Sequence, residues 1–219
     1  MKKRILFASV LLLLLSTYNI QKSSNFNSKL NIKKIDIENI KFIDEKILKN
    51  KLLFLYETNL FFLNEKDIKL KLKEIDFIDS FEVKKIFPNK IKIKVYENIP
   101  IAVIQNKTEK KFFTSNGKAI DFIEIEEFSN LPLVFGDHRS FSDFYKVLKK
   151  VNFPLNEIKK FYLFESRRWD ILTKNNQIIK LPIKDYEISL QNFIDLKDQI
   201  NFGKYQIFDY RINNQIILK

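Results

Sequence analysis

The stretch from residue 78 to residue 97 constrains the fold most, because its side chains alternate with a period of two. Ile91, Ile93 and Val95 alternate with lysines, as in a strand that buries one face and exposes the other. The preceding run, 81–87, alternates in the same way, and Pro88-Asn89 provides a turn between the two runs. The stretch therefore predicts a β-hairpin.

One strand and two helices are predicted before this hairpin. Ile35 and Ile37 alternate in a β-branched run, which is typical of a strand. Asp44 and Asn64 stand where helix N-caps are expected, and apolar residues follow each of them at helical spacing. The predicted order is β-α-α-β-β over residues 32–100. The apolar helix residues are Ile47, Leu48 and Leu52, then Ile68, Leu72 and Ile75.

Residues 101–219 carry many short strand patterns and two helical ones, which predicts a mostly antiparallel β domain with flanking helices. The chain as a whole is thus expected to be α+β. The helices are placed over about 141–151 and after Asp185, and Leu131–Gly136 is interpreted as a rigid connection. The expected strands are Ala102–Gln105, Lys111–Ser115, Ala119–Phe122, Lys159–Phe164, Trp169–Thr173, Gln177–Leu181, Gln206–Ile212 and Gln215–Leu218.

The N-terminus carries an apolar segment behind a basic tail. Residues 1–4 hold three positive charges, and the 17 residues from Ile5 to Gln21 hold none. As a helix, this segment is about 25 Å long, close to the thickness of a hydrocarbon core. The basic tail is expected to stay in the cytoplasm, with the bulk of the chain outside it. The anchor residues are Ile5, Leu6, Phe7, Val10, Leu11, Leu12, Leu13, Leu14 and Leu15.

A cleaved signal peptide is the alternative to an anchor. We favour an uncleaved transmembrane helix over residues 5–21, because no small-x-small cleavage pattern follows Leu15. A polar linker over residues 22–31 would then join the membrane helix to the first folded domain.

The composition excludes several kinds of chemistry. With no cysteine and only three glycines, the chain cannot form disulfides, cysteine-ligated metal sites or glycine-rich phosphate loops. The one histidine, His138, follows Asp137 but has no nucleophile motif around it. We therefore expect no enzymatic activity, no cofactor and no metal site. The net charge of +12 comes mostly from lysines spread along the chain, which favours a solvated surface over nucleic-acid binding.

Three stretches around the hairpin carry a family resemblance. Residues 77–83 (FIDSFEV), 87–93 (FPNKIKI) and 96–102 (YENIPIA) resemble, in order, the motifs of FtsQ/DivIB, a family of bitopic bacterial cell-division proteins. Such proteins have one membrane helix, a POTRA domain and a β domain. Asn98 departs from the family, which usually has arginine there. Weaker matches follow in the expected order at Asn116-Gly117, Leu131–Gly136, Arg167-Arg168-Trp169, Lys180-Leu181-Pro182 and Asp209-Tyr210-Arg211.

The resemblance implies a non-enzymatic scaffold of the division machinery, in the cell inner membrane at the midcell septum. It also implies that FtsB, in complex with FtsL, binds the C-terminal edge of the β domain, and that the POTRA domain binds other division proteins. A terminal strand with no outer neighbour is a template for strand addition. The candidate partner-binding residues are Tyr210, Arg211, Ile212, Gln215, Ile216, Ile217, Leu218, Arg167, Arg168 and Trp169.

Other interpretations stay open at this point. Gln215–Leu218 could close an ordinary hairpin, Trp169 could be a half-buried strand residue, and the two arginines before it could lie on a solvated edge. The alternative function is a POTRA-type envelope assembly or secretion factor that binds unfolded substrate strands. A secreted nucleic-acid-binding protein is a third function, which a strongly salt-dependent affinity for DNA would favour.

Overall fold

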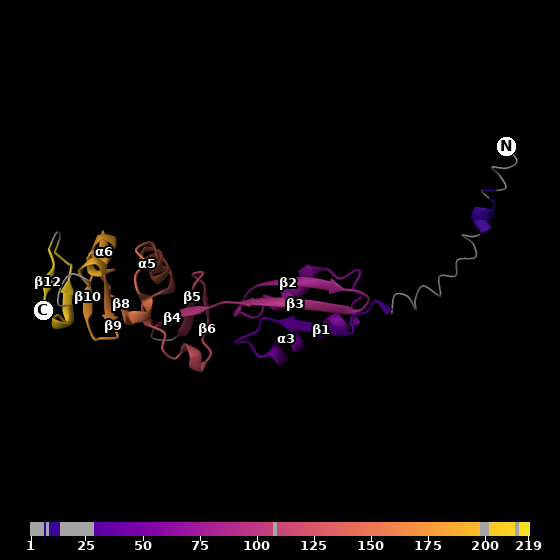
Figure 1. Cartoon of the computed structure of the whole chain (residues 1–219), viewed down its shortest axis with the longest axis horizontal. Coiled ribbons are helices and arrows are strands. Elements are labelled where there is room, and N and C mark those ends of the chain that lie inside the picture. The colour runs from indigo at the N-terminus through magenta and orange to yellow at the C-terminus, as the bar shows by residue number, and fades with distance from the viewer. Residues whose placement is uncertain (1–6, 8, 14–28, 107–108, 198–201, 213–214) are drawn as a thin grey trace. The chain divides into compact units, whose positions relative to one another are not determined.

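The computed structural model describes residues 7, 9–13, 29–106, 109–197, 202–212 and 215–219, and it forms two compact units. The division falls between Glu97 and Asn98 (Figure 1). Of the predicted anchor, Phe7 and 10–13 are described as exposed helical residues. Ile5, Leu6, Leu14 and Leu15 lie outside the described residues. None of the described helices has the length and apolar character needed to span a bilayer.

The first unit has the predicted β-α-α-β-β order. Its three-stranded sheet has the strand order β1-β3-β2, in which β1 runs parallel to β3 and β2 runs antiparallel to it. A 3₁₀ turn, η1 (Leu53–Glu57), lies between the two helices. The other elements are β1 (Lys34–Glu38), α3 (Glu45–Lys51), α4 (Glu65–Leu72), β2 (Ile78–Ile86) and β3 (Lys90–Glu97).

Both helices begin at the predicted caps. The Asp44 carboxylate accepts a hydrogen bond from the backbone N–H of Lys46 at 2.8 Å, and the Asn64 side chain accepts one from Lys66 at 3.0 Å. Ile91, Ile93 and Val95 of β3 are fully buried, which confirms the period of two. They pack in one cluster with the buried helix residues Leu48, Ile68 and Leu72.

The second unit is a nine-stranded mixed sheet in the order β12-β11-β10-β9-β8-β7-β4-β5-β6. Its strands are β4 (Pro100–Gln105), β5 (Lys110–Thr114), β6 (Ala119–Asp121), β7 (Leu133–Phe135), β8 (Ile158–Leu163), β9 (Trp169–Thr173), β10 (Ile178–Lys180), β11 (Ile207–Asp209) and β12 (Ile217–Leu218). Its helices are α5 (His138–Lys150) and α6 (Tyr186–Lys197), with short 3₁₀ turns η2 (Glu126–Phe128), η3 (Leu155–Glu157) and η4 (Phe202–Lys204).

Several details of this sheet differ from the sequence-based expectation. The predicted strand Gln215–Leu218 is limited to the two residues of β12. Leu131–Gly136 is not a plain connection, because its centre forms β7 and pairs in parallel with β4 and β8. The predicted strand Gln206–Ile212 is limited to the three residues of β11, which pairs in parallel with β10. Most of the strand pairs are antiparallel, as predicted. Of the parallel pairs, β7–β8 is connected through α5 and β10–β11 through α6, whereas β4 and β7 are connected through β5, β6 and η2.

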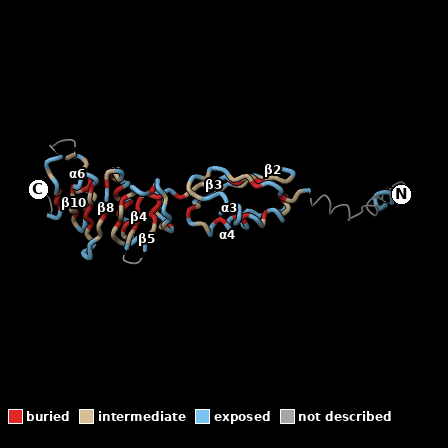
Figure 2. Tube along the Cα trace, turned by 90° about the horizontal axis from the view of Figure 1, so that it is seen from below, coloured by how far each residue is buried: buried red, intermediate tan, exposed pale blue. Residues whose placement is uncertain are grey.

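One continuous apolar row crosses the sheet and forms its core. Six buried residues occupy neighbouring register positions on β4, β7, β8, β9, β10 and β11. Phe144 of α5 and Phe193 of α6 belong to the same buried cluster, so both helices cover this face of the sheet (Figure 1). The buried residues along β4, β8 and β10 are red in Figure 2. The row consists of Ile104, Val134, Phe161, Ile171, Ile179 and Phe208.

Candidate partner-binding site

The strand β12 ends the nine-stranded sheet, and β11 is its one pairing neighbour among the described strands. Ile207 and Lys219 exchange both backbone hydrogen bonds, at 3.0 Å and 3.1 Å. Hydrogen-bonded pairs alternate along an antiparallel ladder, so the next such pair is Asp209–Ile217, and Leu218 lies between the two. The backbone N–H and C=O of Leu218 therefore point away from β11, toward the outer side of the sheet.

The side chains of this terminal segment divide between the two faces of the sheet. Leu218 lies beside Phe208 in the register and packs against the core, as Ile216 does. Ile217 lies on the opposite face and is 37% exposed. The run from 216 to 218 thus attaches to the sheet by alternate side chains.

Asp209 and Arg211 hold the end of β11. The Arg211 guanidinium donates to both carboxylate oxygens of Asp209, at 2.8 Å and 2.6 Å, and the Arg211 backbone N–H donates at 3.1 Å. These hydrogen bonds lower the pKa of the Asp209 carboxyl below its ordinary value, and burial offsets part of the shift. The pair fixes the chain as it leaves β11.

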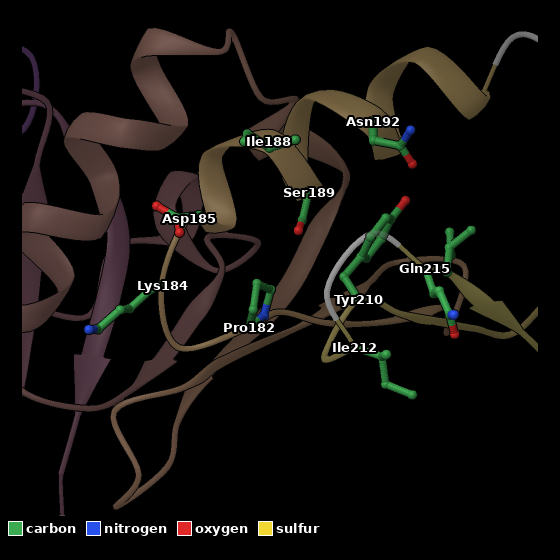
Figure 3. A pocket seen from close by; sticks show the side chains of 10 residues that line it. Pro182, Lys184, Asp185, Ile188, Ser189, Asn192, Tyr210, Ile212 and Gln215 are labelled. Carbon is green, nitrogen blue, oxygen red and sulfur yellow. The ribbon is translucent and has the colours of Figure 1, made fainter.

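A groove of about 450 Å³ lies beside this segment, between α6 and the chain around β11 and β12 (Figure 3). Its rim carries two exposed isoleucines, Ile188 at 73% on α6 and Ile212 at 50%. A groove that combines exposed apolar side chains with a few polar groups is typical of a binding surface. Its lining also includes Ser189 and Asn192 of α6, and Tyr210 and Gln215 near β11 and β12.

Tyr210 lines the groove, but the residue as a whole is only 7% exposed. Its hydroxyl is buried and has no hydrogen-bond partner among the described residues. Figure 3 shows the ring directed toward Asn192 of α6. Burial raises the pKa of Tyr210 well above its ordinary value.

The three candidate residues 167–169 differ from one another in burial and in their contacts. Trp169 is 4% exposed and stacks on Phe144 of α5, with ring centroids 4.7 Å apart. A side chain in that position supports the core and cannot contact a partner at the surface without rearrangement. Arg168 donates to Asp170 at 3.0 Å and lies over the Phe164 ring at 4.5 Å. Arg167 is exposed in the turn between β8 and β9, at φ 60°.

The structure also brings charged residues together in a way that the sequence patterns did not indicate. Asp170, Lys180 and Asp209 occupy neighbouring register positions on β9, β10 and β11. With Arg168 and Arg211 they form a row of charges on the face opposite the helices. Neither this row nor the α6 wall of the groove could be predicted, because both depend on strand register and on where α6 packs.

His138 lies at the start of α5, far from this edge in the strand order. Its Nε2 lies 3.0 Å from the Gly117 carbonyl oxygen, and its ring lies beside Phe113. The preceding Asp137 caps the helix by accepting from the Ser140 N–H at 2.8 Å. Among the described residues, no group of acidic, histidine or cysteine side chains has the arrangement of a metal site.

Comparison with known families accounts for both units. The profile described as "POTRA domain, FtsQ-type" matches residues 30–98, and the one described as "Cell division protein FtsQ/DivIB, C-terminal" matches residues 102–211. The chain belongs to the FtsQ/DivIB family. The motifs around the hairpin indicated this family correctly, and the chain is accordingly a cell division protein. The second match ends before β12, so the terminal strand is not covered by it.

The relatives in this family include the cell division protein FtsQ of Rickettsia typhi, which is 28% identical over 193 residues, or 86% of this chain and 72% of the relative. FtsQ of Rickettsia prowazekii is 30% identical over 165 residues, or 73% of this chain and 61% of the relative. The solved extracytoplasmic domain of DivIB from Geobacillus stearothermophilus shares 12% identity, with a TM-score of 0.34, over 49% of this chain and 98% of that one.

Proposed function

We propose that this chain is a non-enzymatic scaffold of the division machinery that captures FtsB, in complex with FtsL, on the outer edge of β12. The observation that carries the proposal is the backbone of Leu218, whose N–H and C=O point away from the only described neighbour of β12. Such groups form a template on which an extended segment of a partner adds as a further strand.

The surroundings of β12 favour this mode of binding. The residues from Gln215 to Leu218 carry no charge that would repel an incoming strand. The groove beside them exposes Ile188 and Ile212, which offer apolar contacts to side chains of the added segment. Main-chain hydrogen bonds would thus supply part of the affinity, and the groove would supply selectivity. Tyr210 and Arg211 contribute mainly by holding the end of β11 in place.

The proposed scaffold works at the membrane. Residues 5–21 anchor the chain in the cell inner membrane, with both folded units on the outer side and enriched at the septum. The POTRA domain binds other division proteins. Because one anchored chain then holds two partners at once, their effective concentration rises without any chemical step. The cell-division family of the chain supports this role.

The test is capture of a co-expressed FtsB/FtsL pair by the full chain in detergent, with Leu218→Pro as the variant. Proline removes the outward N–H and fixes φ, and edge strands tolerate it where that N–H faces outward. We expect affinity to fall about tenfold or more, which corresponds to about 1.4 kcal/mol. Leu218→Ala keeps the N–H and is the matched control, so it should bind more tightly than the proline variant.

Circular dichroism checks that both variants remain folded. Ile217→Pro is less informative. The backbone N–H of Ile217 faces Asp209, so this substitution would break the pairing of β12 with β11. If folded Leu218→Pro captures the pair as well as the unaltered chain does, strand addition at this edge is wrong.

A further inference from the structure

Three phenylalanines of the first unit are exposed to solvent: Phe61 at 65%, Phe62 at 72% and Phe87 at 57%. Phe61 and Phe62 follow one another between η1 and α4, and Phe87 stands in the turn between β2 and β3. Their exposure is not a packing failure of the loop, since Leu60 and Leu63 on either side of the pair are buried.

Backbone hydrogen bonds bring both loops to the place where the chain enters this unit. The Leu60 N–H donates to the Leu30 carbonyl at 2.8 Å, and the Ile32 N–H donates to Thr58 at 3.1 Å. The Lys33 N–H donates to the Asn89 carbonyl in the turn, at 2.8 Å. Figure 1 shows the turn between β2 and β3 at the same end of the unit as the incoming chain.

A side-chain contact joins the end of β2 to the loop that carries Phe61 and Phe62. The Lys85 ammonium, two residues before Phe87, donates to the Leu63 carbonyl at 2.9 Å. The rings of Phe61 and Phe62 contact each other edge to face, with centroids 5.2 Å apart. The three phenylalanines therefore lie exposed on two loops at the same end of the unit, and this end is here called the aromatic tip (Phe61, Phe62 and Phe87).

We infer that the aromatic tip inserts into the surface of the lipid bilayer. The inference rests on the membrane anchor of the proposed function. Leu30 lies nine positions after Gln21, the end of that anchor, so the chain between them spans about 30 Å at most. The tip is therefore held close to the bilayer, where apolar side chains leave water for the boundary between headgroups and acyl chains.

The charged residues around the tip would be attracted only weakly to a bilayer surface. Lys29 and Lys33 are exposed where the chain enters and would lie near anionic headgroups. Glu57 and Glu65 are exposed at the ends of the loop that carries Phe61 and Phe62, and they offset part of that attraction. We therefore expect insertion of the apolar rings, rather than charge, to hold the tip, and the contact should persist at high salt.

The absence of cysteine in this chain allows a direct test. Phe62→Cys in the full chain gives a single labelling site for a nitroxide spin label, after reconstitution into vesicles of phosphatidylcholine and phosphatidylglycerol. The matched control is Ile99→Cys, at a residue 57% exposed that lies just beyond the opposite end of β3. The eight residues of β3 span about 26 Å between the turn and this opposite end.

We expect the label at position 62 to be several-fold more accessible to oxygen, relative to a water-soluble nickel chelate, than the label at position 99. Adding Phe61→Ser and Phe87→Ser should lower that ratio at position 62. Equal ratios at the two positions, or a difference that disappears at high salt, would overturn insertion. Flotation of the vesicles checks the anchor separately. A chain that floats with equal ratios contradicts only the tip, whereas a chain that does not float contradicts both.

Discussion

The two edges of the nine-stranded sheet are built differently. At β6, the chain continues into a segment that folds back over the sheet, where Phe122 and Phe128 pack on Phe112 with ring centroids 4.8 Å and 5.4 Å away. At β12, residues 217–219 pair with β11 through the backbone, the side chains of Ile216 and Leu218 pack on the core, and a groove lies beside them.

The charges at the two edges differ as well. Asp121 ends β6, and exposed Glu124, Glu126 and Glu127 follow it. Charged residues on and beside an edge strand discourage pairing with another chain. The run from 215 to 218 has none, and Lys219 is the one charged residue that follows it. On the proposed function, the fold protects one edge and leaves the other available to a partner.

The largest expected effects come from removing the aromatic residue that anchors each edge. Phe208→Ala and Phe112→Ala each empty a fully buried site, which should lower the free energy of unfolding by about 3–5 kcal/mol. We expect only Phe208→Ala to impair capture of FtsB/FtsL, because Phe208 lies beside Leu218 in the register. Urea denaturation and pull-down at a low temperature, where both variants are folded, measure the two effects. Equal loss of capture would remove the distinction between the edges.

A proline at the protected edge should leave function intact. The Thr114 N–H donates to the Lys118 carbonyl at 2.9 Å, so the alternation along the β5–β6 ladder directs the Asp121 N–H outward, as at Leu218. We expect Asp121→Pro to change the free energy of unfolding by about 0.5 kcal/mol or less and to leave capture unchanged. Impaired capture in this variant would show that proline acts through general damage to the sheet.

The smallest effect concerns the carboxylate that holds the open edge. Because Arg211 lowers the pKa of Asp209 in the folded protein, the ionised carboxylate stabilises the fold above its ordinary pKa of 3.8, and this contribution is lost as the pH falls through the lower folded value. Arg211 is partly exposed, so Asp209→Asn should cost about 1 kcal/mol or less at neutral pH. The difference from the unaltered chain, measured by thermal unfolding, should shrink below about pH 4. A difference that grows in acid would contradict this sign.

The first unit could be predicted closely from the sequence because its signals are local. Asp44 and Asn64 cap their helices through bonds to residues two positions on, and the alternation of Ile91, Ile93 and Val95 needs no knowledge of neighbours. The structure adds the parallel pairing of β1 with β3, which the sequence pattern alone does not specify.

In the second unit, long-range pairing limits what the sequence can predict. The three residues of β7 are too few to show a period, and their two parallel neighbours lie far away in the chain. Tryptophan is a residue type that is common in interfaces, yet Trp169 stacks on Phe144 and lies in the core. The groove depends on α6, whose position beside β11 and β12 is a property of the folded sheet.

Residue-resolved amide hydrogen exchange tests the central claim most directly, since it reports whether the outer backbone of β12 becomes hydrogen-bonded. On addition of FtsB/FtsL to the full chain in detergent, we expect exchange at the Leu218 amide to slow markedly, because a partner carbonyl would then accept from it. The outward amide of Asp121 on the opposite edge is the internal control and should exchange at an unchanged rate. Exchange at Leu218 that stays as fast in the complex as in the unbound chain would contradict strand addition at β12.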